Sequence, residues 1–263
     1  MKNIFILLVF IIGVVSCEKV IDIPLNEADK KVVIEAVCND RAGESKILLS
    51  KSGSIYEESV FEKINDAVIT ITDKNGIVTT FIEDGTSTGV YGHPAFETEP
   101  DQVYSLSVTI GEEVYTATSV TKTFVPLSLV YYQKEPSSPF IQTDNDSVYT
   151  VSFAYTDNAI DENYYRIKVT KNGVLDSYLY VIDDKLYNGE DYIQPLFANA
   201  FDQGDICFLE FLNMDKANYT YFTSKEAGSD GSATPANPVS NIEGGALGYF
   251  GAYLTDTVTV ILP

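Results

Sequence analysis

Residues 67–83 read AVITITDKNGIVTTFIE, and this stretch indicates the class of fold more clearly than any other part of the chain. On both sides of residues 73–76 (DKNG), apolar side chains fall largely on alternate positions, which is the period of a β-strand that buries one face. The Asn75-Gly76 pair supplies the positive φ values that a tight hairpin turn requires. The sequence therefore predicts two antiparallel strands, residues 67–72 and 77–83, joined by a short turn.

The same alternation predicts further strands on both sides of this hairpin. Residues 103–109 and 113–120 flank Ile110-Gly111 and form a second predicted hairpin, and residues 31–38 and 46–50 are rich in branched side chains. Regularly spaced short strands of this kind are typical of a two-sheet sandwich of immunoglobulin type. The chain contains no Trp, so the Cys-Trp-Cys core of antibody domains is absent. We therefore expect a mainly β protein whose N-terminal immunoglobulin-like β-sandwich spans residues 27–126.

A second β-rich domain is expected over residues 127–263. Val125-Pro126-Leu127 marks the boundary, and fourteen of the eighteen tyrosines lie beyond it. Strands are predicted at residues 129–133, 147–155, 164–170, 177–182, 206–212, 246–254 and 257–262. One short helix is predicted near 215–227, with Asp215 as N-cap and Gly228 beyond its end. Leu212, Tyr219 and Phe222 are its expected buried stripe.

The N-terminus predicts export and a lipid anchor. Lys2 and the apolar residues 4–15 describe a secretory signal, and the run is shorter than the roughly 20 apolar residues of a membrane-spanning helix. Val14-Val15-Ser16-Cys17 resembles a bacterial lipobox, whose cysteine is acylated and becomes the first residue of the mature protein. We expect a signal peptide over 1–16, lipidation at Cys17 and a lipidated tether over 17–26. A plain secretory signal with a chance cysteine is the alternative.

The charge of the chain excludes two classes of partner. Its formal net charge is −21, and loss of Lys2 with the signal leaves 16 basic against 38 acidic residues. No basic patch is available to neutralise nucleic-acid phosphates, and adsorption to anionic headgroups is disfavoured. The lipid on Cys17 must therefore hold the protein on the membrane. The acidity itself indicates either solubility or a cation-binding face.

Few residues suggest chemistry, and we assign no catalytic, cofactor or metal residue. His93 is the single histidine, which excludes a multi-His zinc site, and it is expected to be an exposed loop residue. No G-x-S-x-G or phosphate-binding glycine pattern occurs. Two acidic loops could hold calcium, Asp157 with Asp161 and Glu162, and residues 183–191; neither matches an EF-hand, so solvated turns are the alternative.

Cys38 and Cys207 each share parity with the apolar residues of a predicted strand, so both are expected to be small core residues. An oxidising compartment also allows a disulfide between them.

The tyrosines of the second half are the best candidates for a ligand face, because their rings are amphipathic. Packing against the predicted helix is the alternative for them. The candidates are Tyr178, Tyr180, Tyr187, Tyr192 and Tyr249. The glycines of residues 244–251 allow close backbone approach. They indicate either a tight loop that enters a strand under the helix, with Tyr249 and Phe250 on opposite faces, or a loop that faces a ligand.

Several of these segments, in this order, resemble a known family. They are Cys17 with Glu18-Lys19, VVIEA (32–36), DAVITITDKNG (66–76), the YxLxV…YxAxS hairpin, Asp183-Asp184 with Tyr187-Asn188-Gly189, and PVSNIEGGALGYF (238–250). This set looks like the Bacteroidetes lipoproteins known as domain of unknown function 4249, over nearly the whole mature chain. The last block is the most specific part of the resemblance.

The resemblance implies an outer-membrane lipoprotein, often encoded near TonB-dependent receptors, and no established activity. We therefore expect a non-catalytic binding or accessory subunit, with the membrane and a TonB-dependent receptor as partners in nutrient uptake. Glu18 directly after Cys17 partly resembles a signal for export to the cell surface, although Lys19 dilutes it. The cell surface is thus favoured over the periplasmic face. A surface hydrolase that uses a carboxylate pair and a structural envelope protein are the alternatives.

Overall fold

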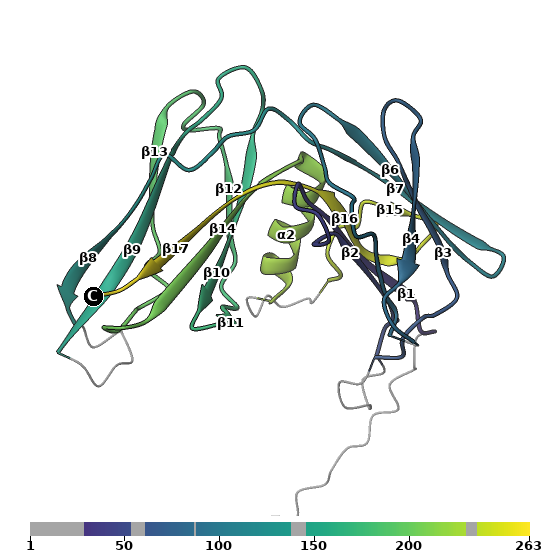
Figure 1. Ribbon diagram of the computed structural model, residues 1–263, viewed down its shortest axis with the longest axis horizontal. Helices are drawn as coiled ribbons and strands as arrows, with labels where there is room; N and C mark the ends of the chain where they lie inside the picture. Colours follow the sequence, from purple (N-terminus) through teal and green to yellow (C-terminus); the bar gives the residue numbers. More distant parts are fainter. Residues whose placement is uncertain (1–28, 54–60, 87, 138–145, 230–235) are drawn as a thin grey trace, which may run out of the picture.

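The computed structural model describes residues 29–53, 61–86, 88–137, 146–229 and 236–263. The predicted signal peptide (1–16), Cys17 and the predicted tether (17–26) lie outside these ranges. The described residues form strands and a single α-helix, so the predicted mainly β fold, with a sandwich followed by a β-rich part that carries one short helix, is confirmed. The strands build two sandwiches, which lie side by side with the helix between them (Figure 1).

The first sandwich forms around the predicted hairpins. Its strands are β1 (Val32–Cys38), β2 (Lys46–Lys51), β3 (Val68–Thr72), β4 (Val78–Glu83), β5 (Val90–Gly92), β6 (Val103–Ile110), β7 (Glu113–Val120), β15 (Ile242–Glu243) and β16 (Leu247–Ala252). Within the described residues they form one sheet in the order β15-β7-β6-β3-β4-β5-β2-β1-β16. The sheet folds over on itself, because its two ends meet where Ala252 N donates to Ser119 Oγ at 2.9 Å. One apolar cluster, with Ile34, Ile71 and Phe250 among its fully buried members, fills the interior.

The turn between β3 and β4 differs in one respect from the prediction. Gly76 has φ +83°, as expected, but Asn75 does not adopt a positive φ. The Asp73 carboxylate stabilises the loop instead, because its Oδ1 accepts hydrogen bonds from the backbone N–H of Asn75 (2.9 Å) and Ile77 (2.8 Å). An aspartate side chain thus takes the role that a second left-handed residue has in a two-residue turn.

The second sandwich has two layers. One contains β10 (Tyr164–Lys171), β11 (Val174–Leu175), β12 (Tyr180–Asp183), β14 (Ile206–Met214) and β17 (Leu254–Ile261). The other, which we call the outer sheet, contains β8 (Leu129–Pro136), β9 (Ser147–Thr156) and β13 (Asp191–Pro195). The orders are β11-β10-β14-β17, with β12 also paired to β10, and β13-β9-β8. Phe153 of the outer sheet packs on Phe211 of the other layer, with ring centroids 5.9 Å apart, inside a second apolar cluster.

The predicted domain boundary is wrong for the C-terminal part of the chain. Residues 127–263 do not form a separate unit, because β15 pairs with β7 and β16 pairs in parallel with β1 of the first sandwich. Only the buried Tyr253 separates β16 from β17, which belongs to the second sandwich. The two strands follow one another in an arc that passes over α2 in Figure 1. The chain therefore returns to the first sandwich before it ends in the second.

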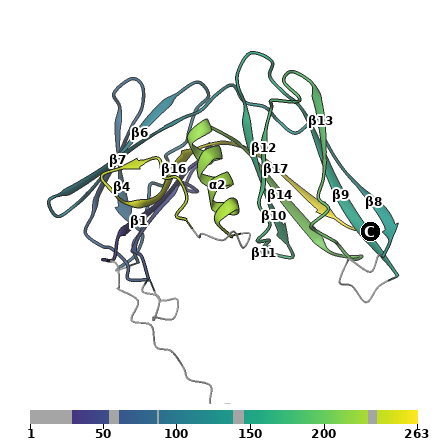
Figure 2. The ribbon, with the colours of Figure 1, turned by 180° about the vertical axis from the view of Figure 1, so that it is seen from behind.

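The helix α2 (Lys216–Ser229) lies between the two sandwiches and contacts β10, β12 and β16 (Figure 2). Asp215 caps its N-terminus, since Asn218 N donates to Asp215 Oδ1 at 2.8 Å, which confirms the predicted cap. Tyr221 and Phe222 are buried, whereas the predicted Tyr219 is half-buried. The helix is short and partly polar, and within the described ranges no helix could cross a membrane.

The two cysteines that the structure describes are buried and free. Cys38 lies in the cluster of the first sandwich and Cys207 in that of the second, so the predicted inward orientation is confirmed and the alternative disulfide is not formed. Burial raises the pKa of the Cys38 thiol well above its ordinary value and that of Cys207 to about 12.

We expect both thiols to be inert in the folded protein, because only the thiolate reacts and its formation requires a pH near or above the raised pKa. In the Cys17→Ala protein at pH 8, iodoacetamide should label no thiol in the native state and two thiols after unfolding in urea. Mass spectrometry measures the count. Rapid labelling of the native protein, or fewer than two thiols in the unfolded and unreduced protein, would contradict the expectation.

Candidate functional site

A cavity of about 340 Å³ opens between β10, α2 and the segment that joins β11 to β12. β10 supplies the charged wall of this cavity. Tyr165 and Ile167 face the second apolar cluster, and because side chains alternate along a strand, Arg166 and Lys168 face the opposite side of the sheet, where the cavity lies. β11 and β12 pair with opposite ends of the same edge of β10, and residues 176–179 between them form one wall. Phe222 and Lys225 of α2 form another wall.

Arg166 is held by aromatic side chains at this cavity. Its guanidinium lies 3.9 Å from the centroid of the Phe222 ring, and the hydroxyl of Tyr249 on β16 lies close enough to interact with it electrostatically. Burial raises the pKa of the Tyr249 hydroxyl, so this neighbour stays neutral and does not neutralise Arg166. The Nε of Arg166 is buried and has no hydrogen-bond partner among the described residues.

The cavity gathers cations in a strongly acidic protein. Seven lysines of the described ranges form ion pairs with carboxylates, such as Lys171 with Asp205 at 2.8 Å. Within the same ranges neither Arg166 nor Lys225 forms an ion pair. Two carboxylates, Asp176 and Glu226, also line the cavity, and Asp176 Oδ1 accepts a hydrogen bond from Tyr178 N at 2.7 Å.

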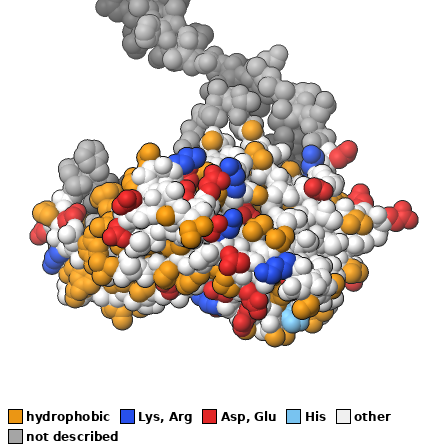
Figure 3. Space-filling view, turned by 90° about the horizontal axis from the view of Figure 1, so that it is seen from above, with side chains coloured by type: hydrophobic (Ala, Val, Ile, Leu, Met, Phe, Trp, Pro, Cys, Tyr) orange, Lys and Arg blue, Asp and Glu red, His pale blue; other side chains and the backbone are white. Residues whose placement is uncertain are grey.

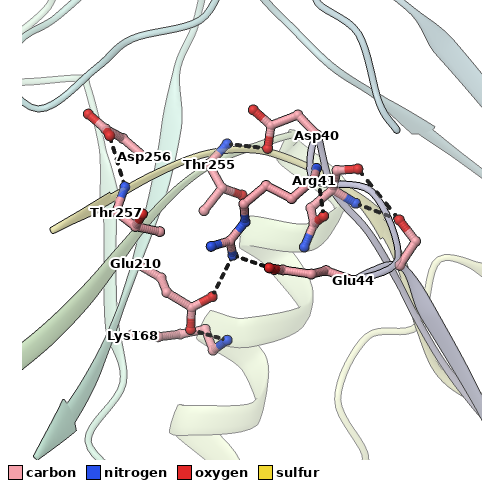
Figure 4. Close-up of polar contacts among 10 residues, drawn as sticks. Asp40, Arg41, Glu44, Lys168, Glu210, Thr255, Asp256 and Thr257 are labelled. Atoms are coloured by element: carbon pink, nitrogen blue, oxygen red, sulfur yellow. Dashed lines mark hydrogen bonds and ion pairs between the residues drawn. The ribbon is translucent and has the colours of Figure 1, made fainter. Parts of the chain in front are cut away.

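The third cation of the cavity, Lys168, belongs to a polar network at the junction of the two sandwiches (Figure 4). Its Nζ lies 2.5 Å from Glu210 Oε2, and Glu210 Oε1 accepts a hydrogen bond from Arg41 Nη2 at 3.1 Å. Arg41 follows β1 and also pairs with Glu44 at 2.8 Å. Beside it, Thr255 N donates to Asp40 Oδ1 at 3.1 Å. The charges next to the cavity thus connect the two sandwiches.

Three of the five predicted ligand-face tyrosines lie at or next to the cavity. Tyr178 lines it and has 53% of its surface exposed. Tyr180 is buried beside Tyr178, with ring centroids 4.6 Å apart, and its hydroxyl donates to Asn199 Oδ1. Tyr249 packs against Tyr221 and Phe222 of α2, and it lies behind Phe222 and Arg166, which line the cavity.

The other two predicted tyrosines lie elsewhere, so the five do not form one face. Tyr187 and Tyr192 contact each other with ring centroids 4.4 Å apart, and Tyr192 also packs on the buried Tyr155. Sequence reasoning missed Arg166, Lys225 and Phe222 as cavity residues. A signal was present, since Arg166 is one of only two arginines in the chain and alternates with apolar residues in a predicted strand.

A comparison with protein-family models assigns nearly the whole chain to one family. Residues 18–259 match the family model described as "Domain of unknown function (DUF4249)". The chain belongs to the DUF4249 family. The match covers nearly all of the chain, which confirms the family resemblance that the sequence segments indicated. No curated protein matches the chain.

Two solved structures are similar to this DUF4249 protein in a general way. The chicken CNTN1 FN1-FN3 domains share 9% identity with a TM-score of 0.26, over 88% of this chain and 66% of that one. A two fibronectin type-III domain segment of chicken tenascin shares 9% identity with a TM-score of 0.23, over 89% and 99% of the respective chains.

The glycine block of the DUF4249 protein lies at the inner face of the first sandwich. Tyr249 faces α2 and Phe250 faces the first apolar cluster, so the two side chains lie on opposite faces of β16, as predicted for a strand under the helix. A Cβ on Gly248 would lie 2.0 Å from the Ile34 carbonyl oxygen, and one on Gly251 would lie 2.0 Å from the Tyr253 hydroxyl. These glycines therefore permit close packing of protein on protein.

The two acidic loops with predicted calcium-binding capacity lie against each other. Asp157 accepts hydrogen bonds from Gly189 N at 2.9 Å and from the Tyr165 hydroxyl, and Asp184 accepts one from Asn163 N at 2.7 Å. These carboxylates are buried and bind protein donors. In the part of the chain that the structure describes, no three His, Cys, Asp or Glu residues are grouped as metal ligands would be.

His93 is not the exposed loop residue that we predicted. It directly follows β5 and is half-buried, with its ring centroid 6.1 Å from that of Phe81. Its Nδ1 accepts a hydrogen bond from Ala95 N at 3.3 Å, so the ring stabilises its own turn.

Proposed function

We propose that this DUF4249 protein is an outer-membrane lipoprotein that binds a ligand without catalysis and serves as an accessory subunit of a TonB-dependent receptor in nutrient uptake. The observation that carries the binding role is the cavity beside α2. Its volume of about 340 Å³ falls within the roughly 300–1,000 Å³ of small-molecule sites. Arg166 and Lys225, which have no ion-pair partner among the described residues, and the exposed Tyr178 line it, and such groups can orient a ligand. The receptor partner rests on the family resemblance.

An exposed apolar surface on the outer sheet supports a protein partner. Leu129 of β8 and Ile193 of β13 flank Ala154 on one face and are each 54% exposed, and the nearby Phe197 is 75% exposed. Figure 3 shows apolar side chains gathered over one end of the molecule. Contiguous apolar surface of this kind is a feature of protein contact sites. We infer that this face contacts the receptor.

The anchor is tested by Cys17→Ala. Because acylation of Cys17 is the proposed attachment, the variant should lose lipid labelling and move from the membrane pellet to the soluble fraction. Fractionation in high salt followed by immunoblotting measures the distribution, with Cys38→Ala as the matched control that should remain in the pellet. A Cys17→Ala protein that stays in washed membranes would refute the lipid anchor.

Two experiments on cells that express the wild-type protein test the proposed side of the membrane and the proposed partner. Protease added to intact cells should digest the wild-type protein, and its native purification from solubilised outer membranes should co-isolate a TonB-dependent receptor. Protection of the protein until the outer membrane is breached would place it on the periplasmic face. Absence of any receptor from the purified complex would leave the structural envelope protein as the better proposal.

One observation favours the hydrolase as the second candidate, because Asp176 and Glu226 both line the cavity. Purified protein should show no turnover of glycosides, esters or peptides if the accessory role is correct. Reproducible turnover that Asp176→Asn abolishes would establish the hydrolase instead.

A further inference from the structure

We propose that the cavity between β10 and α2 binds a small organic anion, whose carboxylate or phosphate group lies between Arg166 and Lys225. This inference rests on the proposed binding function and names the chemistry of its ligand. Nothing in the composition suggests such a site, because the chain has a formal net charge of −21. The positions of the few cations, and their partners among the described residues, determine the chemistry of the cavity.

Arg166 is positioned for an anion that the protein itself does not supply. With 38 acidic residues in the chain, a carboxylate could have been placed beside it, yet no ion pair involves Arg166 among the described residues. The guanidinium instead packs on the aromatic face of Phe222 and lies near the neutral hydroxyl of Tyr249, and neither group neutralises it. A planar guanidinium held in this way is suited to bidentate recognition of carboxylate or phosphate.

Lys225 supplies a second charge on the opposite wall. It lies on the exposed surface of α2, within the described residues it has no ion-pair partner, and it lines the same cavity as Arg166. Lys168 lies deeper in the network and is already compensated by Glu210. Arg166 and Lys225 are therefore the cations of the cavity without an ion-pair partner among the described residues, and Asp176 and Glu226 place two negative charges on the same walls.

The remaining walls indicate that the anion carries an apolar or ring-shaped body. Leu175, Leu179 and Tyr178 also line the cavity, and Tyr178 has 53% of its surface exposed. A volume of about 340 Å³ accommodates a small molecule but not a folded partner. Inorganic ions would leave this apolar surface uncovered.

The test uses the full chain, purified in detergent, and three probes of similar size: benzoate, phenyl phosphate and the uncharged benzyl alcohol. Saturation-transfer difference NMR measures binding and gives a Kd by titration. We expect at least one anion to bind at least tenfold more tightly than benzyl alcohol, and the preferred anion identifies the headgroup. Lys225→Gln and Arg166→Gln should each weaken that anion by about tenfold or more, as for loss of a charged hydrogen bond.

Lys63→Gln is the matched control, since it removes the same charge from an exposed position outside the cavity and should leave the Kd unchanged. Arg166 also packs on Phe222, so far-UV circular dichroism must show that the Arg166→Gln protein is folded. If that protein does not fold, Lys225→Gln still tests the proposal, because Lys225 is exposed. Equal binding of the anions and benzyl alcohol, or an equal effect of Lys225→Gln and Lys63→Gln, would overturn the proposal. The anchoring and receptor experiments do not depend on this result, so failure of either can be recognised separately.

Discussion

Gly248→Ala should destabilise the protein by about 3–5 kcal/mol, a large part of the roughly 5–15 kcal/mol that stabilises a typical domain. Gly248 has φ +98°, which an L side chain rarely adopts, and a Cβ there would lie 2.0 Å from the carbonyl oxygen of Ile34. Ile34 is its partner in the parallel pair of β1 and β16, so relief of the clash must separate the two strands. Urea denaturation followed by circular dichroism measures the loss.

Gly245→Ala is the matched control for this prediction. Gly245 has a similar φ of +88°, but no atom lies within 4 Å of the position of its Cβ. Its substitution should therefore cost only the backbone strain, about 1 kcal/mol. Equal losses for the two variants would show that the close approach of β1 and β16 does not contribute, which would contradict the predicted cause.

Asp215→Ala should produce the second large loss, about 3–4 kcal/mol, because it leaves several buried donors without an acceptor. Asp215 is buried, and its Oδ2 accepts hydrogen bonds from Ser119 Oγ at 2.7 Å and Val120 N at 2.9 Å. Its Oδ1 caps α2 through Asn218 N at 2.8 Å. The same carboxylate therefore holds the helix and attaches it to the first sandwich. Chemical denaturation measures the free energy of unfolding.

Asp73→Ala tests whether burial of the carboxylate causes the large loss of stability that we expect for Asp215→Ala. The Asp73 carboxylate also accepts two backbone hydrogen bonds, but it lies in an exposed turn where water can replace it. We expect a clearly smaller change in the denaturation midpoint than for Asp215→Ala. If the exposed and buried aspartates cost the same, unsatisfied donors at the junction are not the cause of the loss.

The strands that could be predicted from sequence are those long enough to show a period of two. Residues 103–109 and 113–120 alternate over a whole strand, and the structure places β6 and β7 there. Val90–Gly92 and Ile242–Glu243 were missed because two or three residues cannot display a period. The pairing of β1 with β16 was missed for another reason. Apolar alternation reveals that a segment is a strand, but backbone hydrogen bonds between distant strands carry no local sequence pattern.

The cavity illustrates a similar limit for functional residues. The sequence shows where lysines and arginines occur, but the fold decides which of them meet a carboxylate. Lys168 lies directly across from Glu210 of β14 and forms an ion pair with it. Arg166, two residues away on the same strand, lies across from Leu212 and has no ion-pair partner among the described residues. The sequence shows that the second half of the chain is rich in tyrosine. It does not show that one of these tyrosines lies at the rim of the cavity, another packs under α2, and two others contact each other elsewhere.

The junction through Tyr253 also determines how the molecule would respond to mechanical force. β1 and β16 are parallel and are paired at six positions, and β16 continues through Tyr253 into the second sandwich. A pull between the N-terminal end of β1 and the second sandwich acts on these two strands in opposite directions along their axes. All the hydrogen bonds between them then share the tension, instead of opening one after another from an end. Sliding of β1 past β16 would be the step that resists extension.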